Sequence, residues 1–335
     1  MESQSNPGEQ ASSPADTQVA HARTVKGDIL GAIGDTPLVY LPKLSPKPGV
    51  NIYAKLEGHN PTGSVKDRIA LHMITRAEAD GTLTPGKTVL EPTSGNTGIS
   101  LAMICKIKGY KLKVVMPENV SPERAQLLEA YGAEILFSKG AGGSNHAIVV
   151  AQDLYVSDPD TYFMPYQYGN ESNPLAHYET TGVEILEALP QIDTFVAGLG
   201  TGGTLMGVGR RLKEYNPDIQ VIAVVPSPDD AIQGLRSLDD GFIPPILNTD
   251  LLDSRIMIEG KEAFATTRFL LEKEGIFAGI SSGSVIAGAL RIAHRMDKGN
   301  VVCLLADGGW KYLSTNLWTT DYGDLESQVR GKIWW

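Results

Sequence analysis

A lysine stands at the start of a predicted helix, in the segment NPTGSVKDRIA at residues 60–70. Lys66 falls in the first turn of that helix, where the positive end of the helix dipole disfavours a cation. A desolvated lysine in this place is easier to hold as an amine, or as an imine with a carbonyl compound. The alternative is a surface lysine whose charge is balanced by Asp67.

A glycine-rich turn, GLGTGG at residues 198–203, joins a predicted strand to a predicted helix. Backbone N–H groups in such a turn can bind an anion closely, because glycine has no Cβ. A dinucleotide site would need an acidic residue at the end of the next strand, which instead ends in Pro226 and Ser227. No lysine follows the glycines, which excludes a Walker loop. The turn indicates either a phosphate cradle, with hydroxyls from Thr201 and Thr204, or a structural turn.

A second strand-to-helix turn is PTSGNTG at residues 92–98. Thr93, Ser94, Asn96 and Thr97 place polar groups beside the positive end of a helix, which suits a carboxylate. The alternative is an ordinary capped helix start, with Ser94 or Asn96 as the N-cap.

A third turn, GISSGS at residues 279–284, offers Ser281 or Ser282 as a helix cap. A serine hydroxyl also suits a neutral pyridine nitrogen, whereas an aspartate would keep that nitrogen protonated. One lysine, a phosphate cradle, a carboxylate-binding turn and a neutral hydroxyl together describe a site for pyridoxal phosphate, whose ring is an electron sink. A serine partner makes a milder sink, which favours β-elimination and β-replacement.

The elements that must position these turns alternate between strand-like and helix-like segments from about Thr24 onward. The strands are short and rich in Val, Ile and Leu, which predicts parallel sheets covered by helices on both faces. Two such blocks meet near residues 160–170, in agreement with the roughly two domains expected for 335 residues. In open α/β sheets ligands bind beyond the carboxyl ends of the strands, where the three turns fall.

Composition excludes several classes of protein. The chain has 29 Lys and Arg against 39 Asp and Glu, a net charge of −10 that gives no footprint for nucleic acid or an anionic membrane. No apolar run reaches the roughly 18 residues of a membrane span. Cys105 and Cys303 lie in apolar segments and are expected to be buried and reduced, so we predict no metal site. Residues 1–22 lack the apolar core of a signal peptide, so we expect a disordered leader and a cytoplasmic protein.

The motifs occur in the order of a known family. NPTGSVKDR, EPTSGNTGISLAM, QYGNESNPLAHYETTG, GLGTGGT and EGIFAGISSGS resemble the cysteine synthase and cystathionine β-synthase family, and the resemblance runs from about Ile33 to Ser314. These are fold-type II pyridoxal phosphate enzymes, similar to the tryptophan synthase β chain. The resemblance therefore implies an α/β protein with two open twisted sheets flanked by helices, acting as a homodimer.

The resemblance also assigns roles to residues. It implies that Lys66 carries the cofactor as an imine, that Asn96 hydrogen-bonds the ring hydroxyl, and that Ser281 faces the pyridine nitrogen. The residues implied to hold the cofactor phosphate are Gly200, Thr201, Gly202, Gly203 and Thr204. The residues implied to bind the substrate carboxylate are Thr93, Ser94, Gly95, Thr97 and Gln167.

A finer resemblance concerns GLRSLDDGFIPPIL, residues 234–247, and LLADGGWKYLSTNLW with the tail DLESQVRGKIWW. These segments are similar to CysM-type O-phosphoserine sulfhydrylases, which use O-phospho-L-serine and take sulfur from a thiocarboxylated ubiquitin-like carrier protein. Their selectivity arginine matches Arg236. A guanidinium binds phosphate through two hydrogen bonds, whereas an acetyl ester offers it no charged partner. The alternative is a surface arginine in an irregular loop.

The predicted organisation follows the same family. We expect a smaller N-terminal α/β domain at 58–166 and a larger one formed by 24–57 together with 167–318. The tail 319–335 ends in two tryptophans, which favours docking at the active site over a solvated chain.

The resemblance therefore predicts formation of L-cysteine by β-replacement on an activated serine. Alternatives are an O-acetylserine sulfhydrylase that uses sulfide, a cystathionine β-synthase, a synthase of a non-protein amino acid, and a non-catalytic binding protein that kept the fold. The nucleophile is the feature that the sequence indicates least.

Overall fold

The computed structural model describes residues 25–93, 95–118, 120, 122–140, 143–228, 230, 232–320 and 323. The predicted leader 1–22, Ser94 and nearly all of the predicted tail lie outside these residues. In the described part of the chain, no helix is long and apolar enough to cross a membrane.

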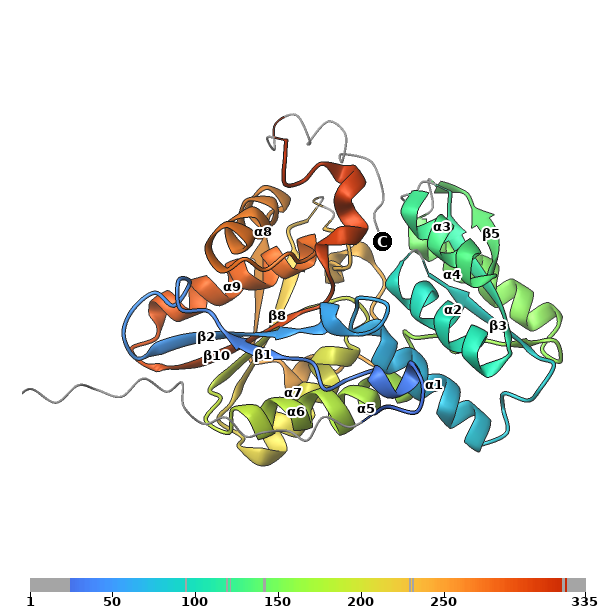
Figure 1. Ribbon diagram of the computed structural model, residues 1–335, viewed down its shortest axis with the longest axis horizontal. Helices are drawn as coiled ribbons and strands as arrows, with labels where there is room; N and C mark the ends of the chain where they lie inside the picture. Colours follow the sequence, from blue (N-terminus) through green and yellow to red (C-terminus); the bar gives the residue numbers. More distant parts are fainter. Residues whose placement is uncertain are drawn as a thin grey trace, which may run out of the picture.

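A six-stranded sheet forms the larger part of the molecule, with the strand order β1-β2-β10-β7-β8-β9 (Figure 1). β1 is antiparallel to β2, and the other neighbours are parallel. β10, from the end of the chain, lies between β2 and β7, so strands that are far apart in sequence share one carboxyl edge. The strands are Leu38–Tyr40 (β1), Val50–Leu56 (β2), Thr194–Gly198 (β7), Gln220–Pro226 (β8), Ser254–Ile258 (β9) and Gly299–Leu305 (β10).

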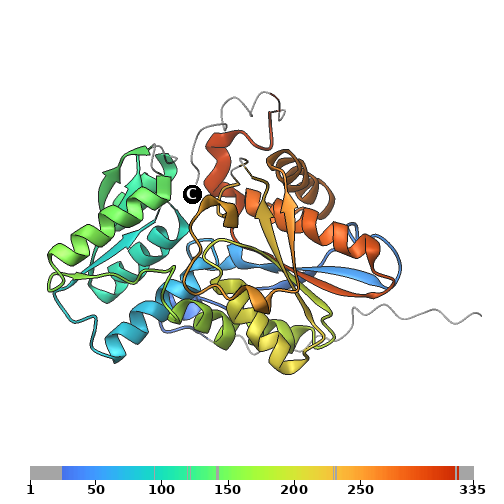
Figure 2. The ribbon, with the colours of Figure 1, turned by 180° about the vertical axis from the view of Figure 1, so that it is seen from behind.

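Helices cover both faces of this sheet, as Figure 2 shows from behind. Apolar residues of α8 and α9 pack with one face of the sheet, and those of α6 and α7 pack with the other. Adjacent residues of β7 alternate between these cores, since Val196 belongs to the first and Ala197 to the second. The helices are Gly182–Ala188 (α6), Gly203–Tyr215 (α7), Gly260–Glu274 (α8) and Ile280–Arg295 (α9).

A four-stranded parallel sheet, with the order β5-β4-β3-β6, forms the smaller part. α2 and α3 contribute apolar residues to the core on one of its faces, and α4 covers the other. The strands are Thr88–Pro92 (β3), Lys111–Pro117 (β4), Glu134–Ser138 (β5) and Tyr162–Phe163 (β6). The helices are Asn96–Lys108 (α2), Pro122–Tyr131 (α3) and Gly143–Ser157 (α4). The prediction of two sheets flanked by helices is confirmed.

We call residues 88–163 the smaller lobe, and residues 38–56 together with 182–320 the larger lobe. Helices α1 (Lys66–Ala79) and α5 (Ser172–Ala176) lie between them and pack against each other (Figure 1). The domain limits predicted near 58 and 166 stay a prediction. Cys105 and Cys303 are buried free thiols, as expected.

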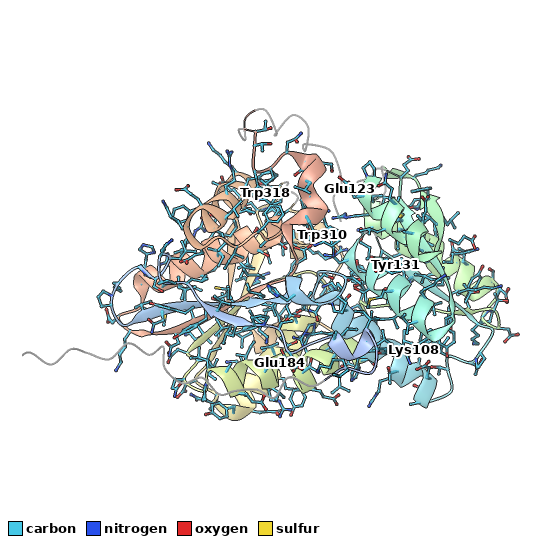
Figure 3. All side chains as sticks on the ribbon, in the orientation of Figure 1. Lys108, Glu123, Tyr131, Glu184, Trp310 and Trp318 are labelled. Carbon is cyan, nitrogen blue, oxygen red and sulfur yellow. The ribbon has the colours of Figure 1, made fainter. Side chains whose placement is uncertain are left out.

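A buried ion-pair network fixes α1 to the larger lobe. Arg68 pairs with Glu57 at 2.7 Å and with Glu184 at 2.6 Å, and Lys55 pairs with Glu184 at 2.6 Å. Figure 3 labels Glu184. Burial by itself would raise the pKa of Glu184, but hydrogen bonds and charge from Arg68 and Lys55 lower it to about 2. The first turn of the helix that begins with Lys66 is therefore held by charged contacts with two neighbouring elements.

Candidate active site

Lys66 is the first residue of α1, beyond the carboxyl end of β2, and its side chain is half-buried. The preceding backbone is joined to the segment after β10, because the N–H of Val65 donates to the carbonyl of Ala306 at 2.8 Å. Burial lowers the pKa of Lys66, while Asp307 and Glu57 act in the opposite direction. This environment favours the neutral amine that a proton acceptor needs.

The glycine-rich turn after β7 borders a cavity of about 40 Å³. Gly202 has φ of +89°, a conformation that lets the chain reverse before α7 and that favours glycine. A Cβ on Gly200 would lie 2.9 Å from the carbonyl oxygen of Gly234, so only glycine fits there. The predicted site residues that line this cavity are Lys66, Gly200, Thr201, Gly202, Thr204 and Ser281.

Asn173 supports this turn from α5. Its Nδ2 donates to Thr201 Oγ1 at 3.0 Å and to the carbonyl of Gln167 at 2.8 Å. Thr201 Oγ1 in turn accepts from the N–H of Gly203 at 3.3 Å, and a Cβ on Gly203 would overlap the Asn173 amide. The turn is thereby held in the form of a cradle at the N-terminus of a 13-residue helix.

His177 was not expected from the sequence and lies behind the cradle. Its Nε2 is 3.2 Å from Thr204 Oγ1, and its Nδ1 is 3.0 Å from Thr181 Oγ1. Burial, followed by the charges of Lys66 and Arg68, lowers the pKa of His177 well below its ordinary value. The ring is therefore neutral at pH 7, with one nitrogen donating and the other accepting.

The turn at residues 92–98 joins β3 to α2 and lies across a second cavity, of about 100 Å³, that Lys66 also lines. Thr97 Oγ1 donates to Gln167 Oε1 at 2.7 Å, which confines both side chains. Gln167 is fixed in turn by the buried carboxylate of Glu91, which accepts its N–H at 3.1 Å. The predicted carboxylate-binding residues that line this cavity are Thr93, Gly95, Thr97 and Gln167, and Ser94 lies outside the described residues.

Asn96 lies between charged groups that the sequence did not predict. Lys311 Nζ donates to Asn96 Oδ1 at 2.6 Å, and Asn96 Nδ2 donates to Asp307 Oδ2 at 2.7 Å. A lysine can only donate and a carboxylate can only accept, so these partners set the orientation of the amide. Burial lowers the pKa of Lys311 to about 8, against the charges of Asp307 and Asp67. The interpretation of Asn96 as N-cap is wrong, because Gly95 holds that position and the amide is engaged elsewhere.

Ser281 lies in the first turn of α9 and is 6% exposed. The N-cap of α9 is Gly279, so the interpretation of Ser281 or Ser282 as the cap is wrong. Residue 279 has to be glycine, because the carboxylate of Asp307 occupies the space that a Cβ there would need. Ser281 lines the smaller cavity, as Lys66 does.

Arg236 lies in the loop after β8, and its side chain is 5% exposed. The guanidinium lies 4.8 Å from the ring centre of Phe242 and 5.5 Å from that of Tyr168, and its Nη1 donates to Asn145 Oδ1 at 3.3 Å. It lines the cavity of about 100 Å³ together with Lys66 and the turn at residues 92–98. The interpretation of Arg236 as a surface residue is therefore wrong.

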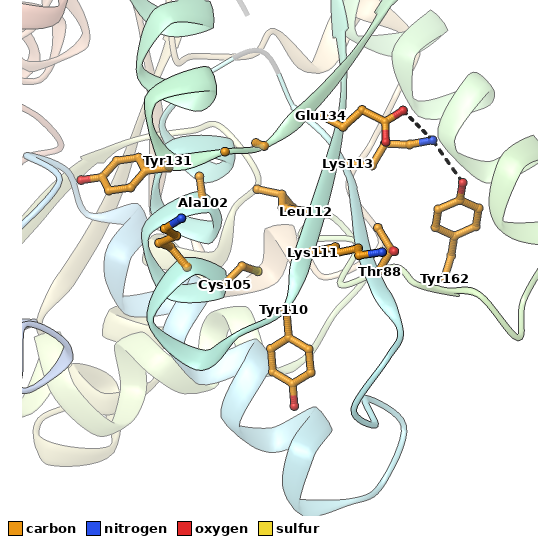
Figure 4. Close-up of a pocket in the computed structure, with 13 residues that line it drawn as sticks. Thr88, Ala102, Cys105, Tyr110, Lys111, Leu112, Lys113, Tyr131, Glu134 and Tyr162 are labelled. Carbon is orange, nitrogen blue, oxygen red and sulfur yellow. Dashed lines mark hydrogen bonds and ion pairs between the residues drawn. The ribbon is translucent and has the colours of Figure 1, made fainter.

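A larger cavity, of about 430 Å³, lies at the opposite, amino edge of the smaller sheet (Figure 4). Within it, Lys113 pairs with Glu134 at 2.8 Å and donates to the Tyr162 hydroxyl at 3.3 Å. None of the residues that the sequence predicted for the site lines this cavity. Residues that the sequence predicted for the site line the two smaller cavities instead, and Lys66, Gly200 and Thr201 line both of them.

The paired cavities fit pyridoxal phosphate. Residues 200 and 203 of the cradle can only be glycine, because a Cβ at either would lie too close to neighbouring atoms. A backbone without side chains lets a phosphate come close to its N–H groups. The amide of Asn96 keeps a second hydrogen on Nδ2 beside its bond to Asp307, which suits a ring hydroxyl. A buried hydroxyl, Ser281, and a half-buried amine, Lys66, lie on the same cavity.

The chain matches the model of the family described as pyridoxal-phosphate dependent enzyme over residues 29–307. It is 46% identical to the probable cysteine synthase of Bacillus subtilis over 299 residues, which cover 86% of this chain and 96% of that protein. The crystal structure of a cysteine synthase from Entamoeba histolytica aligns with a TM-score of 0.84 and 34% identity, covering 96% of this chain and 98% of the other.

A crystal structure of O-ureido-L-serine synthase aligns with a TM-score of 0.83 and 39% identity, covering 90% of this chain and 99% of the other. The family model and the relative from Bacillus subtilis both extend over most of the chain. They agree with the fold of two sheets flanked by helices. The chain thus belongs to the pyridoxal-phosphate dependent enzymes of fold-type II, in the cysteine synthase family.

Proposed function

We propose that this protein forms L-cysteine by replacing the phosphate of O-phospho-L-serine with sulfur. The observation that carries this proposal is the buried guanidinium of Arg236, which lines the same cavity as Lys66 and the turn at residues 92–98. A buried cation at this point matches an anionic leaving group and has no charged partner in a neutral acetyl ester. The names of the similar proteins support the cysteine synthase reaction in general.

Each residue's place in the cavities determines the role that we propose for it. The turn with Thr93, Gly95 and Thr97, next to the N-terminus of α2, holds the substrate carboxylate, together with Gln167. Lys66 Nζ takes the proton from Cα and returns it after the replacement. Arg236 holds the phosphate while the bond between Cβ and oxygen breaks and a bond between Cβ and sulfur forms. Bound pyridoxal phosphate supplies the electron sink for the charge at Cα.

The environment of Lys66 supports its part as a base. Burial lowers its pKa, so that more of the amine is neutral near pH 7 than for a lysine in water. Lys311 holds the Asn96 amide in place, since its Nζ donates to Asn96 Oδ1 at 2.6 Å. The narrowness of the cavities, about 40 and 100 Å³, favours exclusion of water from the reacting atoms.

The proposal also covers the source of the sulfur. We propose a thiocarboxylated ubiquitin-like carrier protein, on the resemblance of residues 234–247 and of the terminal segment to phosphoserine sulfhydrylases. Free sulfide is the alternative. The homodimer expected for the family also stays a prediction.

A second candidate is a β-replacement with a different nucleophile. The similar structure named O-ureido-L-serine synthase favours this, because it shows that the same fold carries an enzyme whose product is not cysteine. An O-acetylserine sulfhydrylase and a cystathionine β-synthase remain further outcomes of the experiment below. A colourless protein that does not take up the cofactor would indicate a binding protein.

The test compares O-phospho-L-serine with O-acetyl-L-serine in the wild type and in Arg236→Ala. We expect the wild type to prefer the phosphorylated substrate. The substitution should lower kcat/KM for that substrate about 100-fold, since a charged hydrogen bond contributes about 1.5–3 kcal/mol, and should change the acetylated substrate little. Exposed Arg255→Ala, on β9, is the matched control. Equal losses for both substrates would remove Arg236 from the selectivity.

A further inference from the structure

A buried carboxylate, that of Glu91, lies directly before the turn at residues 92–98. Glu91 is the fourth residue of β3 and is fully buried. Its Oε2 accepts the N–H of Tyr166 at 2.8 Å, and its Oε1 accepts the N–H of Gln167 at 3.1 Å. Of these residues, Gln167 lines the cavity of about 100 Å³ and Glu91 does not. Glu91 therefore acts on a ligand in this cavity through the residues that it binds.

The backbone that Glu91 binds has an uncommon conformation. Tyr166 has φ of +52°, in the left-handed region that bulky residues rarely adopt. The other described non-glycine residues with positive φ are Asp35 and Asn316, whose types tolerate it. Two successive N–H groups meet one carboxylate here, as in the backbone nests that bind anions. The carboxylate thus stabilises a conformation that a tyrosine by itself disfavours.

Gln167 is held by three hydrogen bonds, one at each of three polar groups. Its N–H donates to Glu91, its carbonyl accepts from Asn173 Nδ2 at 2.8 Å, and its Oε1 accepts from Thr97 Oγ1 at 2.7 Å. None of the hydrogen bonds among the described residues uses Gln167 Nε2. Since Thr97 occupies the amide oxygen, the side chain keeps two N–H donors for a ligand of the cavity, and a carboxylate is a matching acceptor.

We propose that Glu91 is a positioning residue that holds Gln167 in the orientation in which its side-chain amide binds the carboxylate of the substrate. This inference rests on the part of the proposed function that assigns the substrate carboxylate to Gln167 and the turn at residues 92–98. It adds a residue that lies outside the cavity.

The choice of an acid at residue 91 supports this role. Burial raises the pKa of Glu91 to about 8, and the hydrogen bonds from the N–H groups of Gln167 and Tyr166 act in the opposite direction. A buried carboxylate is costly, so these two donors are what favours its ionised form. A glutamine of the same shape would avoid the cost, but its Nε2 would face one of the two N–H groups, donor against donor.

The test compares L-alanine with ethylamine, which differ only in the carboxylate. Binding to the cofactor-loaded protein is followed by the absorption of the bound cofactor at about pH 8.5, where Glu91 is mostly ionised. Glu91→Gln should weaken the binding of L-alanine about 10-fold and that of ethylamine less than about 2-fold. Exposed Glu129→Gln, on α3, makes the same chemical change in the same lobe and should bind both ligands like the wild type. Equal losses for the two ligands, or no loss for either, would overturn the inference.

A double-mutant cycle shows whether Glu91 acts through Gln167. Gln167→Ala alone should weaken the binding of L-alanine about 10-fold or more. Adding Glu91→Gln to Gln167→Ala should cost less than about 2-fold further, because no side-chain amide is left to position. A merely structural role of Glu91 would make the two losses multiply, and that result would refute the inference.

Kinetics and a second variant complete the test. Glu91→Gln should raise KM for the activated serine about 10-fold and change kcat less than about 3-fold, since the carboxylate is bound before and during the reaction. If Glu91→Gln does not fold, Glu91→Asp decides by the same two ligands. Its carboxylate is one methylene further from the two N–H groups, so L-alanine alone should bind more weakly.

The outcomes distinguish this inference from the proposed function. If Gln167→Ala loses the preference for L-alanine over ethylamine and Glu91→Gln keeps it, the proposed carboxylate site stands and the role of Glu91 is refuted. If Gln167→Ala also keeps it, the proposed carboxylate site fails together with the inference. A wild type that prefers O-acetyl-L-serine would refute the proposed substrate alone, because neither L-alanine nor ethylamine has a leaving group.

Discussion

The buried imidazole of His177 affects the stability of the folded protein as well as the active site. His177 is enclosed by α5, α7 and the cradle, and it is the hydrogen-bond partner of Thr204. Its depressed pKa means that the folded protein binds this proton less readily than the unfolded chain does. Folding is therefore opposed whenever the pH is low enough to protonate a histidine in the unfolded chain.

We predict an acid-dependent loss of stability that His177 causes. Above pH 6.5 the ring is neutral in both states and folding incurs no penalty. As the pH falls below 6.5 the unfolded chain gains the proton first, so the free energy of unfolding falls by up to about 1.4 kcal/mol per pH unit. Urea midpoints at pH 5.5 and 7.5 should differ less in His177→Gln than in the wild type, whereas exposed His294→Gln should match the wild type. An unaltered difference in His177→Gln would contradict this account.

At the residue scale, the sequence was sufficient where one segment carries the chemistry. Lys66, the cradle and the turn at residues 92–98 were each predicted from a short motif of residues that are neighbours in the chain. Lys311 and Asp307 could not be found in this way. Asn96 and Lys311 are 215 positions apart, and only the fold brings them to 2.6 Å. The one available signal was that Asp307 and Lys311 both lie in ADGGWKY, directly after the strand predicted at NVVCLLA.

Helix packing is the element-scale feature that holds the cradle in place. α7 begins in the cradle, and its Gly207 lies against the backbone of α5 and of the π-helical turn His177–Thr181. A Cβ at Gly207 would overlap the carbonyl oxygen of Pro174 and would lie 2.9 Å from the backbone nitrogen of Tyr178. Backbone atoms cannot rotate out of the way as a side chain can, so α5 and α7 would have to separate.

We predict that Gly207→Ala destabilises the protein by about 1–3 kcal/mol, although alanine by itself favours a helix by about 1 kcal/mol. The separation of α5 and α7 should also disturb Asn173, and so weaken the cradle and the retention of pyridoxal phosphate. Thermal unfolding and cofactor dissociation measure the two effects. Gly27→Ala, where no atom lies within 4 Å of the new Cβ, is the control. A stabilised Gly207→Ala would show that helix propensity outweighs the packing.

Element types were predictable, and element neighbours were not. Short apolar strands alternating with helices indicated covered parallel sheets, because that pattern has few other solutions. The order of the strands has no such local signal, since every parallel strand here has the same apolar character. The placement of β10 between β2 and β7 therefore came only from the structure, and this placement is what brings Asp307 to Asn96 and Lys66.

At the scale of the whole molecule, the net charge and the charge of the site have opposite signs. The chain carries −10, while the described lining of the cavity of about 100 Å³ includes two arginines, Arg124 and Arg236. The phosphorylated substrate that we propose must approach an acidic protein before it meets these cations. The approach depends on long-range forces that salt screens, whereas the buried contacts are screened much less.

This contrast predicts an unusual response to salt. The Debye length falls from about 30 Å at 0.01 M to about 8 Å at 0.15 M, so added salt should remove the repulsion outside the cavity. The association rate of O-phospho-L-serine should therefore rise a few-fold while its dissociation rate changes little. Stopped-flow recording of the cofactor's absorption measures both rates, and the zwitterion O-acetyl-L-serine, with no net charge, is the control.

The sign of the effect is decisive. A protein whose binding site dominated its field would show the opposite trend, with association slowing as salt is added. Two salts with different anions should give the same increase, because competition for Arg236 by one anion would instead weaken binding. A falling association rate in both salts would mean that the cations of the cavity act beyond its mouth and outweigh the acidic surface.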